Sequence, residues 1–215
     1  MLTYLPFYAK LTSDERSLLH SRSRVLYLKH DEQLMTASEC IGMVSVLDGQ
    51  LRAYISSDSG KEITLYRLLE RDMCVLSASC VIKGLDLSIN IMADKDSKVL
   101  LVPANIFESL VKSNSHVNAF STEMLASRLS EVMWAMEQIA FKGLDSRLAH
   151  YLLEQASLEG NLLIKTTHEI IARDLGSARE VISRLLKYLE NEGMVELSRN
   201  VIKIIDYKKL ATLSE

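Results

Sequence analysis

Long apolar runs are missing from this chain. No stretch comes close to the roughly 18 consecutive apolar residues that indicate a membrane span, because charges such as Glu131 and Glu137 interrupt the most apolar segments. Near the first residue, positive charge comes only at Lys10, and no small-residue cleavage pattern follows it. We therefore expect neither a bilayer crossing nor a secretion signal.

Cysteine is scarce, and neither sign of charge dominates. Cys40, Cys74 and Cys80 form an odd and small set, which predicts no disulfide framework and a reducing, cytoplasmic location. The 215 residues hold 25 Lys and Arg against 28 Asp and Glu, a net charge of −3. Proteins that bind nucleic acid through overall charge are basic, so a DNA-binding role here depends on a local surface.

Glycine and proline are also few, eight and two, and they mark the joints between elements. Apolar and polar side chains alternate over residues 44–55 around Asp48-Gly49, which predicts a β-hairpin. After a second turn at 56–60, the alternation resumes at residues 61–68, 87–93 and 98–102. Short strands at this spacing indicate a sandwich or a barrel.

From about Asn105 the period changes from two to about 3.6, and residues 104–142 contain neither Gly nor Pro. This predicts one short and one long helix. Apolar residues recur along the long helix at spacings of four and three, which is typical of a seam between helices. The seam consists of Leu125, Leu129, Val132, Met136 and Ile139. We favour a parallel dimer through this seam; the alternative is that the helix packs only on its own barrel.

Gly143 ends the long helix, and Asp145 is the expected N-cap of the next one, so we place a domain boundary here. Beyond it we expect a helix up to Gly160, a strand over 162–165 and two helices. A hairpin of residues 194–197 and 201–205 closes the order.

Residues 168–185 have the spacing of a helix-turn-helix. Thr166 with Glu169 predicts a capping box for the first helix, and Gly176 supplies the tight turn. Ser177 with Glu180 predicts a second box.

The second helix of this pair is predicted to have two different faces. Its buried stripe consists of Ile182, Leu185, Leu186 and Leu189. The opposite face carries Arg179, Glu180, Ser183, Arg184 and Lys187. A polar helical face is usually only solvated, but these donors and acceptors match guanine, cytosine and phosphate where a second helix would enter the major groove.

On these motifs the whole chain resembles a Crp/Fnr transcription regulator. The most specific match is residues 176–190 followed by 192–195, which is similar to the DNA-binding signature of that family. The resemblance implies an α+β fold with an N-terminal β jelly-roll (cupin-like) sensor domain over residues 1–115, a dimerisation helix over 116–142 and a winged helix-turn-helix over 143–215. One position departs, because Ala178 stands where many members have Ser or Thr, which removes one candidate phosphate contact.

The resemblance also assigns roles in reading DNA. Glu180 and Arg184 correspond to the pair that reads the GA core of each half-site of a palindromic operator. Ser183 matches the fumarate-nitrate type, with half-sites like TTGAT, and Arg179 the cyclic-AMP type, with half-sites like TGTGA. Candidate phosphate contacts are Thr167, His168, Ser177 and Lys187.

The sensor's effector does not follow from the sequence. The Gly-Glu and Arg-Ser pairs of cyclic-AMP members are absent, and Asp86-Leu87-Ser88 lies where the phosphate-binding arginine is expected. An aspartate repels phosphate, so we expect an effector other than a cyclic nucleotide. Cys40, Cys74 and Cys80 are candidates for an iron-sulfur cluster, haem or thiol redox sensing, and the alternative is that they are buried structural residues.

Two other classes of protein are alternatives to a transcription regulator. A cupin-like metalloenzyme needs two or three converging His with a carboxylate, and only His20 and His30 precede residue 115. A winged-helix module that contacts only proteins is the second alternative. We expect no enzyme; the expected partners are double-stranded DNA, a second copy of the chain and, as a candidate, RNA polymerase.

Overall fold

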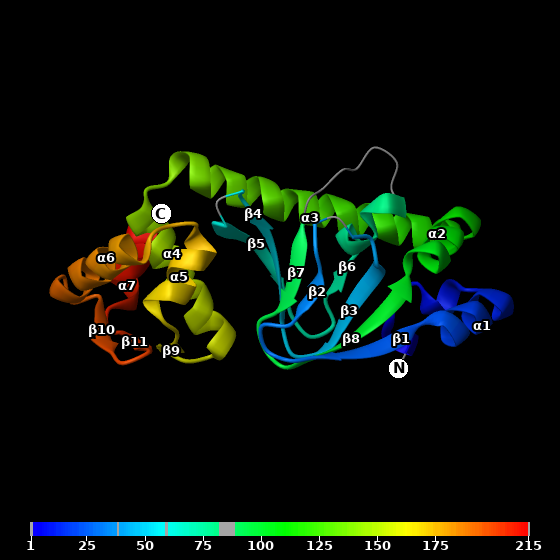
Figure 1. Ribbon diagram of the computed structural model, residues 1–215, viewed down its shortest axis with the longest axis horizontal. Coiled ribbons are helices and arrows are strands. Elements are labelled where there is room, and N and C mark those ends of the chain that lie inside the picture. Colours follow the sequence, from blue (N-terminus) through cyan, green and yellow to red (C-terminus); the bar gives the residue numbers. More distant parts are fainter. Residues whose placement is uncertain (1, 38, 59, 82–88, 215) are drawn as a thin grey trace. The chain divides into compact units, whose positions relative to one another are not determined.

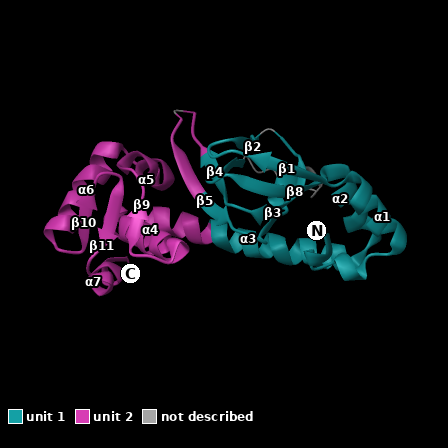
Figure 2. Cartoon of the chain, turned by 90° about the horizontal axis from the view of Figure 1, so that it is seen from below, with its two compact units in different colours: residues 1–55, 65–132 teal, residues 56–64, 133–215 magenta. Residues whose placement is uncertain are grey.

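The computed structural model describes residues 2–37, 39–58, 60–81 and 89–214, with only the backbone described for 79–81 (Figure 1). Packing divides the chain into two compact units (Figure 2). The first comprises Met1–Ile55 and Leu65–Val132, and the second comprises Ser56–Thr64 and Met133–Glu215. The short segment 56–64 thus packs with the C-terminal part of the chain.

Two four-stranded sheets form the frame of the first unit. One has the strand order β1-β8-β3-β6 and the other β2-β7-β4-β5. The five strand pairs of this unit whose registers are described are antiparallel. The strands are β1 (Arg24–Leu28), β2 (Gln33–Met35), β3 (Gly42–Asp48), β4 (Leu51–Ser56), β5 (Glu62–Leu68), β6 (Met73–Cys74), β7 (Asn90–Ala93) and β8 (Ser97–Pro103). This arrangement agrees with the predicted sandwich or barrel.

The predicted hairpin around Asp48-Gly49 is wrong, because β3 and β4 lie in different sheets. In β3, Met43 pairs with Val102 of β8, whereas in β4 Arg52 pairs with Met92 of β7. Alternation of apolar and polar residues specifies which face of a strand is buried, but it does not specify the neighbouring strand. The turn at 56–60 does join neighbours, since β4 and β5 are adjacent in one sheet.

The first sheet separates two apolar clusters. The cluster between the sheets includes Val44, Val46, Leu51, Ile91 and Val99. On the other side of the first sheet, helices α1 (Ser13–Arg22) and α2 (Ala104–Ser113) and the 3-10 turns η1 (Leu2–Tyr4) and η2 (Tyr8–Lys10) supply the second cluster. Helix α1, which the sequence analysis did not predict, starts with a capping box of Thr12 and Glu15. A further 3-10 segment, η3, spans Leu76–Val81.

Helix α3 (Ser115–Phe141) is the predicted long helix, and α2 is the predicted short one. The side chain of Asn114 starts α3, because its Oδ1 accepts hydrogen bonds from the backbone N–H groups of His116 and Val117 at 3.0 and 3.4 Å. None of the helices in the described part of the chain combines the length and the apolarity that a membrane span needs.

The C-terminal unit confirms the predicted order of helix, strand, two helices and two strands. Its elements are α4 (Leu144–Glu159), β9 (Leu163–Lys165), α5 (His168–Leu175), α6 (Arg179–Asn191), β10 (Val195–Ser198), β11 (Val201–Ile204) and α7 (Tyr207–Ser214). Helix α7 was not predicted, and the N-cap of α4 is Gly143 rather than Asp145. The three strands form a sheet of order β10-β11-β9.

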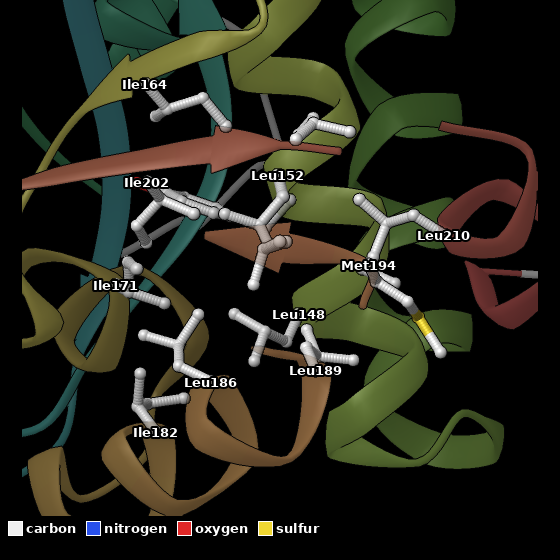
Figure 3. Close-up of a cluster of buried hydrophobic side chains, with 14 of the residues drawn as sticks. Leu148, Leu152, Ile164, Ile171, Ile182, Leu186, Leu189, Met194, Ile202 and Leu210 are labelled. Carbon is white, nitrogen blue, oxygen red and sulfur yellow. The ribbon is translucent and has the colours of Figure 1, made fainter. Parts of the chain in front are cut away.

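The core of this unit is mostly aliphatic and includes one aromatic residue, Tyr151 (Figure 3). Leu148 and Leu152 of α4 meet Ile182, Leu186 and Leu189 of α6 there, each with no exposed surface. A buried leucine or isoleucine side chain of this kind contributes about 1.5 to 3 kcal/mol to folding. This core fixes which face of α6 points outward.

Candidate nucleic-acid interface

Helix α5 begins one residue later than its predicted capping box. Its N-cap is Thr167, whose Oγ1 accepts a hydrogen bond from the backbone N–H of Ile170 at 3.2 Å. Thr166 is buried instead, and its N–H donates to the carbonyl of Asn200 at 3.2 Å. The expected box of Thr166 and Glu169 is therefore wrong, because either of two adjacent threonines can serve as the N-cap and the helix uses the second, which has Ile170 rather than an acidic residue at its third position.

The second predicted box, of Ser177 and Glu180, is also wrong. The N-cap of α6 is Ala178, and no side chain caps the helix there. The backbone N–H of Ser177 donates to the carbonyl of Ala172 at 2.8 Å, which is part of the C-terminal end of α5. As a result the carboxylate of Glu180 is not needed for capping, and Glu180 is exposed.

The outward face of α6 carries the predicted reading residues. Arg179, Glu180 and Arg184 are exposed, whereas Ser183 is half-buried. The Nε of Arg184 donates to the carbonyl of Glu180 at 3.4 Å, one turn earlier. The helix therefore presents two guanidinium groups and one carboxylate close to its first two turns.

Two predicted contacts are brought together across the motif. The Nδ1 of His168, at the start of α5, lies 2.8 Å from the Oγ of Ser183 on α6. The pair ties the two helices to each other, so Ser183 already has a partner within the protein. The sequence placed both residues at the interface but gave no sign of this contact.

Lys187 lies one turn beyond Ser183 and is ion-paired. Its Nζ is 2.6 Å from Oε2 of Glu190, while Oε1 of Glu190 accepts a hydrogen bond from the N–H of Leu197 at 3.1 Å. The pKa of Glu190 lies below its usual value, mainly because Lys187 donates a hydrogen bond to its carboxylate and also because the N–H of Leu197 does. An exposed pair of this kind contributes little to stability.

The hairpin of β10 and β11, which we call the wing, adds a residue that the sequence analysis missed. Its turn is Arg199-Asn200, and Asn200 has a φ of 59°. A hollow of about 400 Å³ lies among the wing, the start of α5 and Arg179. Its lining residues are Thr166, Thr167, His168, Glu169, Arg179, Ser198, Arg199, Asn200, Val201 and Ile202. The missed residue is Arg199. Its position in the turn of the hairpin after α6 is the feature of the sequence that could have indicated it.

The cysteines of the first unit differ in state. Cys40 is disulfide-bonded, which corrects the expectation of reduced cysteines, because a count of cysteines does not show which sulfurs the fold brings within bonding distance. Cys74 is free and buried, with its Sγ 3.5 Å from Oη of Tyr66. Burial raises the pKa of Tyr66 well above its usual value. The side chain of Cys80 and the segment Asp86-Leu87-Ser88 lie outside the described residues.

A buried arginine lies beside Tyr66 and was not among the residues predicted from the sequence. Arg128 of α3 is 6% exposed and lies over the ring of Tyr66, with its Cζ 5.0 Å from the ring centroid. It donates to the carbonyl of Met73 at 3.2 Å and to both oxygens of Glu131 at 2.8 and 2.6 Å. Among the described residues, no group of three or more His, Cys, Asp or Glu side chains is arranged to hold a metal ion.

The predicted helix seam divides into two sets. Leu125 and Val132 pack against the core of the barrel. Leu129, Met136 and Ile139 are 62, 56 and 40% exposed in the single chain. The seam thus includes residues that α3 uses for its own barrel and residues that this chain leaves uncovered.

Comparison with known proteins shows which family has this fold and sequence. A transcriptional regulator of the Crp/Fnr family from Eubacterium rectale ATCC 33656 is 43% identical in sequence, with a TM-score of 0.94 and coverage of 99% of both chains. The chain belongs to the Crp/Fnr family. The family model for a Crp-like helix-turn-helix domain matches residues 146–213.

More distant relatives agree with this Crp/Fnr assignment. The transcriptional regulator SdrP of Thermus thermophilus is 31% identical over 97 residues, which are 42% of this chain and 48% of that protein. The cAMP-activated global regulator CRP of Pasteurella multocida is 24% identical over 165 residues, 74% of this chain and 78% of its own. These relatives are regulators and not enzymes, so the metalloenzyme alternative fails and this Crp/Fnr protein is a DNA-binding transcriptional regulator.

Proposed function

We propose that the protein binds a palindromic operator with GA-core half-sites as a homodimer and places α6 of each subunit in the major groove. The observation that carries this proposal is the exposed row of Arg179, Glu180 and Arg184 on a helix whose other face packs into the core of the unit. An arginine guanidinium forms two hydrogen bonds with guanine, and a carboxylate accepts from the amino group of cytosine. The carboxylate of Glu180 does not cap α6 and is available for that role.

Phosphate contacts position such a helix without reading sequence. We assign this role to Thr167, His168, Ser177 and Lys187, with Ala178 contributing no hydroxyl. Because the chain has a net charge of −3, the attraction for DNA has to come from this surface. A DNA-binding role agrees with the cytoplasmic location that we expect for the protein.

The operator is palindromic in this proposal because the dimer has two-fold symmetry. We assign the dimer contact to Leu129, Met136 and Ile139, with Leu125 and Val132 supporting the same helix from the barrel side. The functional division into residues 1–115, 116–142 and 143–215 follows from these roles. RNA polymerase is a further candidate partner.

For the sensor domain we propose a signal other than a cyclic nucleotide. The disulfide at Cys40 favours thiol chemistry over an iron-sulfur cluster, because a sulfur in a disulfide is not a thiolate ligand. A Cys40→Ser variant should then lose any change in DNA affinity on oxidation. Haem and other effectors become the leading candidates if the variant responds like the wild type.

Selection from a random DNA pool tests the proposed function directly. The full-length protein at fixed salt should enrich palindromes whose half-sites share a GA core and whose centres are about 10 base pairs apart. Enrichment of single half-sites, or of no common sequence, would contradict the proposal.

A further inference from the structure

The segment 56–64 belongs to the same compact unit as the helix-turn-helix (Figure 2). Thr64 lies 3.2 Å from Asp174 on α5, with its hydroxyl donating to the Oδ1 of the carboxylate. Two residues earlier, Oε2 of Glu62 is 3.9 Å from Nε of Arg173. Two adjacent side chains of α5 thus meet two side chains of this segment.

Asp174 is an unusual residue for the end of a short surface helix. Only 2% of its side chain is exposed, and its carboxylate lies 3.7 Å from Nε of Arg173. A buried carboxylate is costly unless hydrogen bonds satisfy it. The hydroxyl of Thr64 provides one such bond, so the segment helps to stabilise a charge that α5 keeps out of water.

The turn between α5 and α6 is packed against the same segment. Gly176 has a φ of +63°, and a Cβ built on it would lie 2.7 Å from Cγ1 of Ile63. Glycine is therefore required here both by the backbone and by the approach of a side chain. The carbonyl of the preceding residue, Leu175, accepts a hydrogen bond from Nη2 of Arg147 at 2.6 Å.

This packing matters because α6 has no side-chain cap of its own. The place where the helix starts depends on the turn before it, and that turn is held by Ile63 and by the neighbours of Asp174. The first residues after the start are Arg179 and Glu180, which the proposed function assigns to base reading.

We propose that Glu62, Ile63 and Thr64 are positioning residues for DNA reading: they hold the turn that sets the start of α6. This inference rests on the proposed function. The same strand also connects these residues to the barrel core. From Thr64, β5 continues to Tyr66 and Leu68, which are buried between the two sheets, so a change in the core could reach the turn along one strand. Tyr66 is the residue in contact with Cys74.

The test is a Thr64→Val substitution in the full-length protein, which removes the hydroxyl and keeps the shape. Affinity for the selected operator and for unrelated DNA is measured by fluorescence anisotropy at one salt concentration. We expect operator affinity to fall about fivefold to tenfold, the low end of typical coupling between sites. Affinity for unrelated DNA, which depends on charge, should not change. The matched control is Thr212→Val, whose hydroxyl donates to the carbonyl of Lys208 within α7.

An unchanged ratio of operator to unrelated-DNA affinity in Thr64→Val, or a higher operator affinity, would overturn the proposal. If that variant does not fold, amide hydrogen exchange of the wild type decides the question. Because coupling is reciprocal, operator binding should slow exchange in segment 56–64, and equal exchange with and without operator would also overturn it. If operator affinity responds to Arg184→Ala but not to Thr64→Val, only this inference fails; a wild type that binds no operator refutes the proposed function and this inference together.

Discussion

Helices α3 and α6 each bury one side, but their outward sides differ in chemistry. The outward side of α6 is charged, with Arg179, Glu180 and Arg184 exposed. On α3 the outward residues include Leu129 at 62% and Phe141 at 84% exposure. A charged face is stable in water, whereas a run of large exposed apolar side chains marks a contact surface. The difference agrees with the two kinds of partner proposed above: nucleic acid for α6 and a second copy of the chain for α3.

A charge in the apolar surface of α3 should have the largest effect. Leu129→Asp places like charges opposite each other in the dimer contact, so we expect a monomer in sedimentation velocity. Loss of simultaneous binding to two half-sites should reduce operator affinity about 100-fold or more. Leu129 is a better site for this test than Val132. Val132 packs on the barrel core, so its replacement would also disturb folding.

Leu129→Met is the matched control for that prediction, since it keeps the volume and the apolar surface. It should remain dimeric and bind the operator like the wild type. A dimeric Leu129→Asp variant, or a wild type that sediments as a monomer at micromolar concentration with and without DNA, would show that the exposed side of α3 has another use.

A change in the charged face of α6 should have an intermediate effect. Arg184→Ala removes a two-point contact with guanine and should cost about 1 to 3 kcal/mol of operator binding, with relaxed preference at one base pair per half-site. Arg71→Ala, an exposed arginine of the first unit, is the control. Competition binding with operators mutated base by base measures both the affinity and the preference. Equal behaviour of wild type and Arg184→Ala would remove the base-reading assignment.

Within the same face, Lys187→Ala should have a smaller and less selective effect. A phosphate contact does not distinguish bases, so affinity should fall alike for all sequences. The slope of log affinity against log salt should decrease by about one unit per subunit. Titrations at several salt concentrations measure this slope. An unchanged slope would mean that Lys187 keeps Glu190 as its partner when DNA is bound.

Neither face should respond to cyclic AMP or cyclic GMP. A ligand present at 100 times its dissociation constant stabilises the folded state by about 2.7 kcal/mol, which a melting experiment detects readily. We expect no shift in melting temperature, no change in sedimentation and no change in operator affinity with either nucleotide. A clear rise in melting temperature would restore the cyclic-nucleotide interpretation of the barrel.

The sequence was most informative where structure depends on near neighbours. The apolar period of α6 predicted its buried residues, including Ile182 and Leu186, because helical faces follow directly from spacing. The N-cap residues were predicted less accurately. A shift of the cap from Thr166 to Thr167 leaves the apolar spacing of the helix unchanged, so the spacing does not distinguish the two. The αL turn at Gly176 was found because few other residues adopt that conformation.

Contacts between distant residues could not be predicted from one sequence. The partner of β3, the disulfide at Cys40 and the ring contact of Arg128 all depend on chain segments that only the fold brings together. The same holds for the contact of Thr64 with Asp174, which are 110 residues apart. Helices α1 and α7 were missed because their apolar patterns are short.

The environment of Gly176 has a consequence for how the chain tolerates mutation. Gly160 has a similar φ of +60°, but a Cβ there would meet nothing within 4 Å. In a library of all single substitutions, Gly160 should accept asparagine, the residue that best tolerates this conformation after glycine. At Gly176 asparagine would meet the side chain of Ile63, so substitutions there should be rescued only together with a smaller residue at position 63. The two positions are therefore expected to drift as a pair among descendants of this sequence, while Gly160 drifts alone.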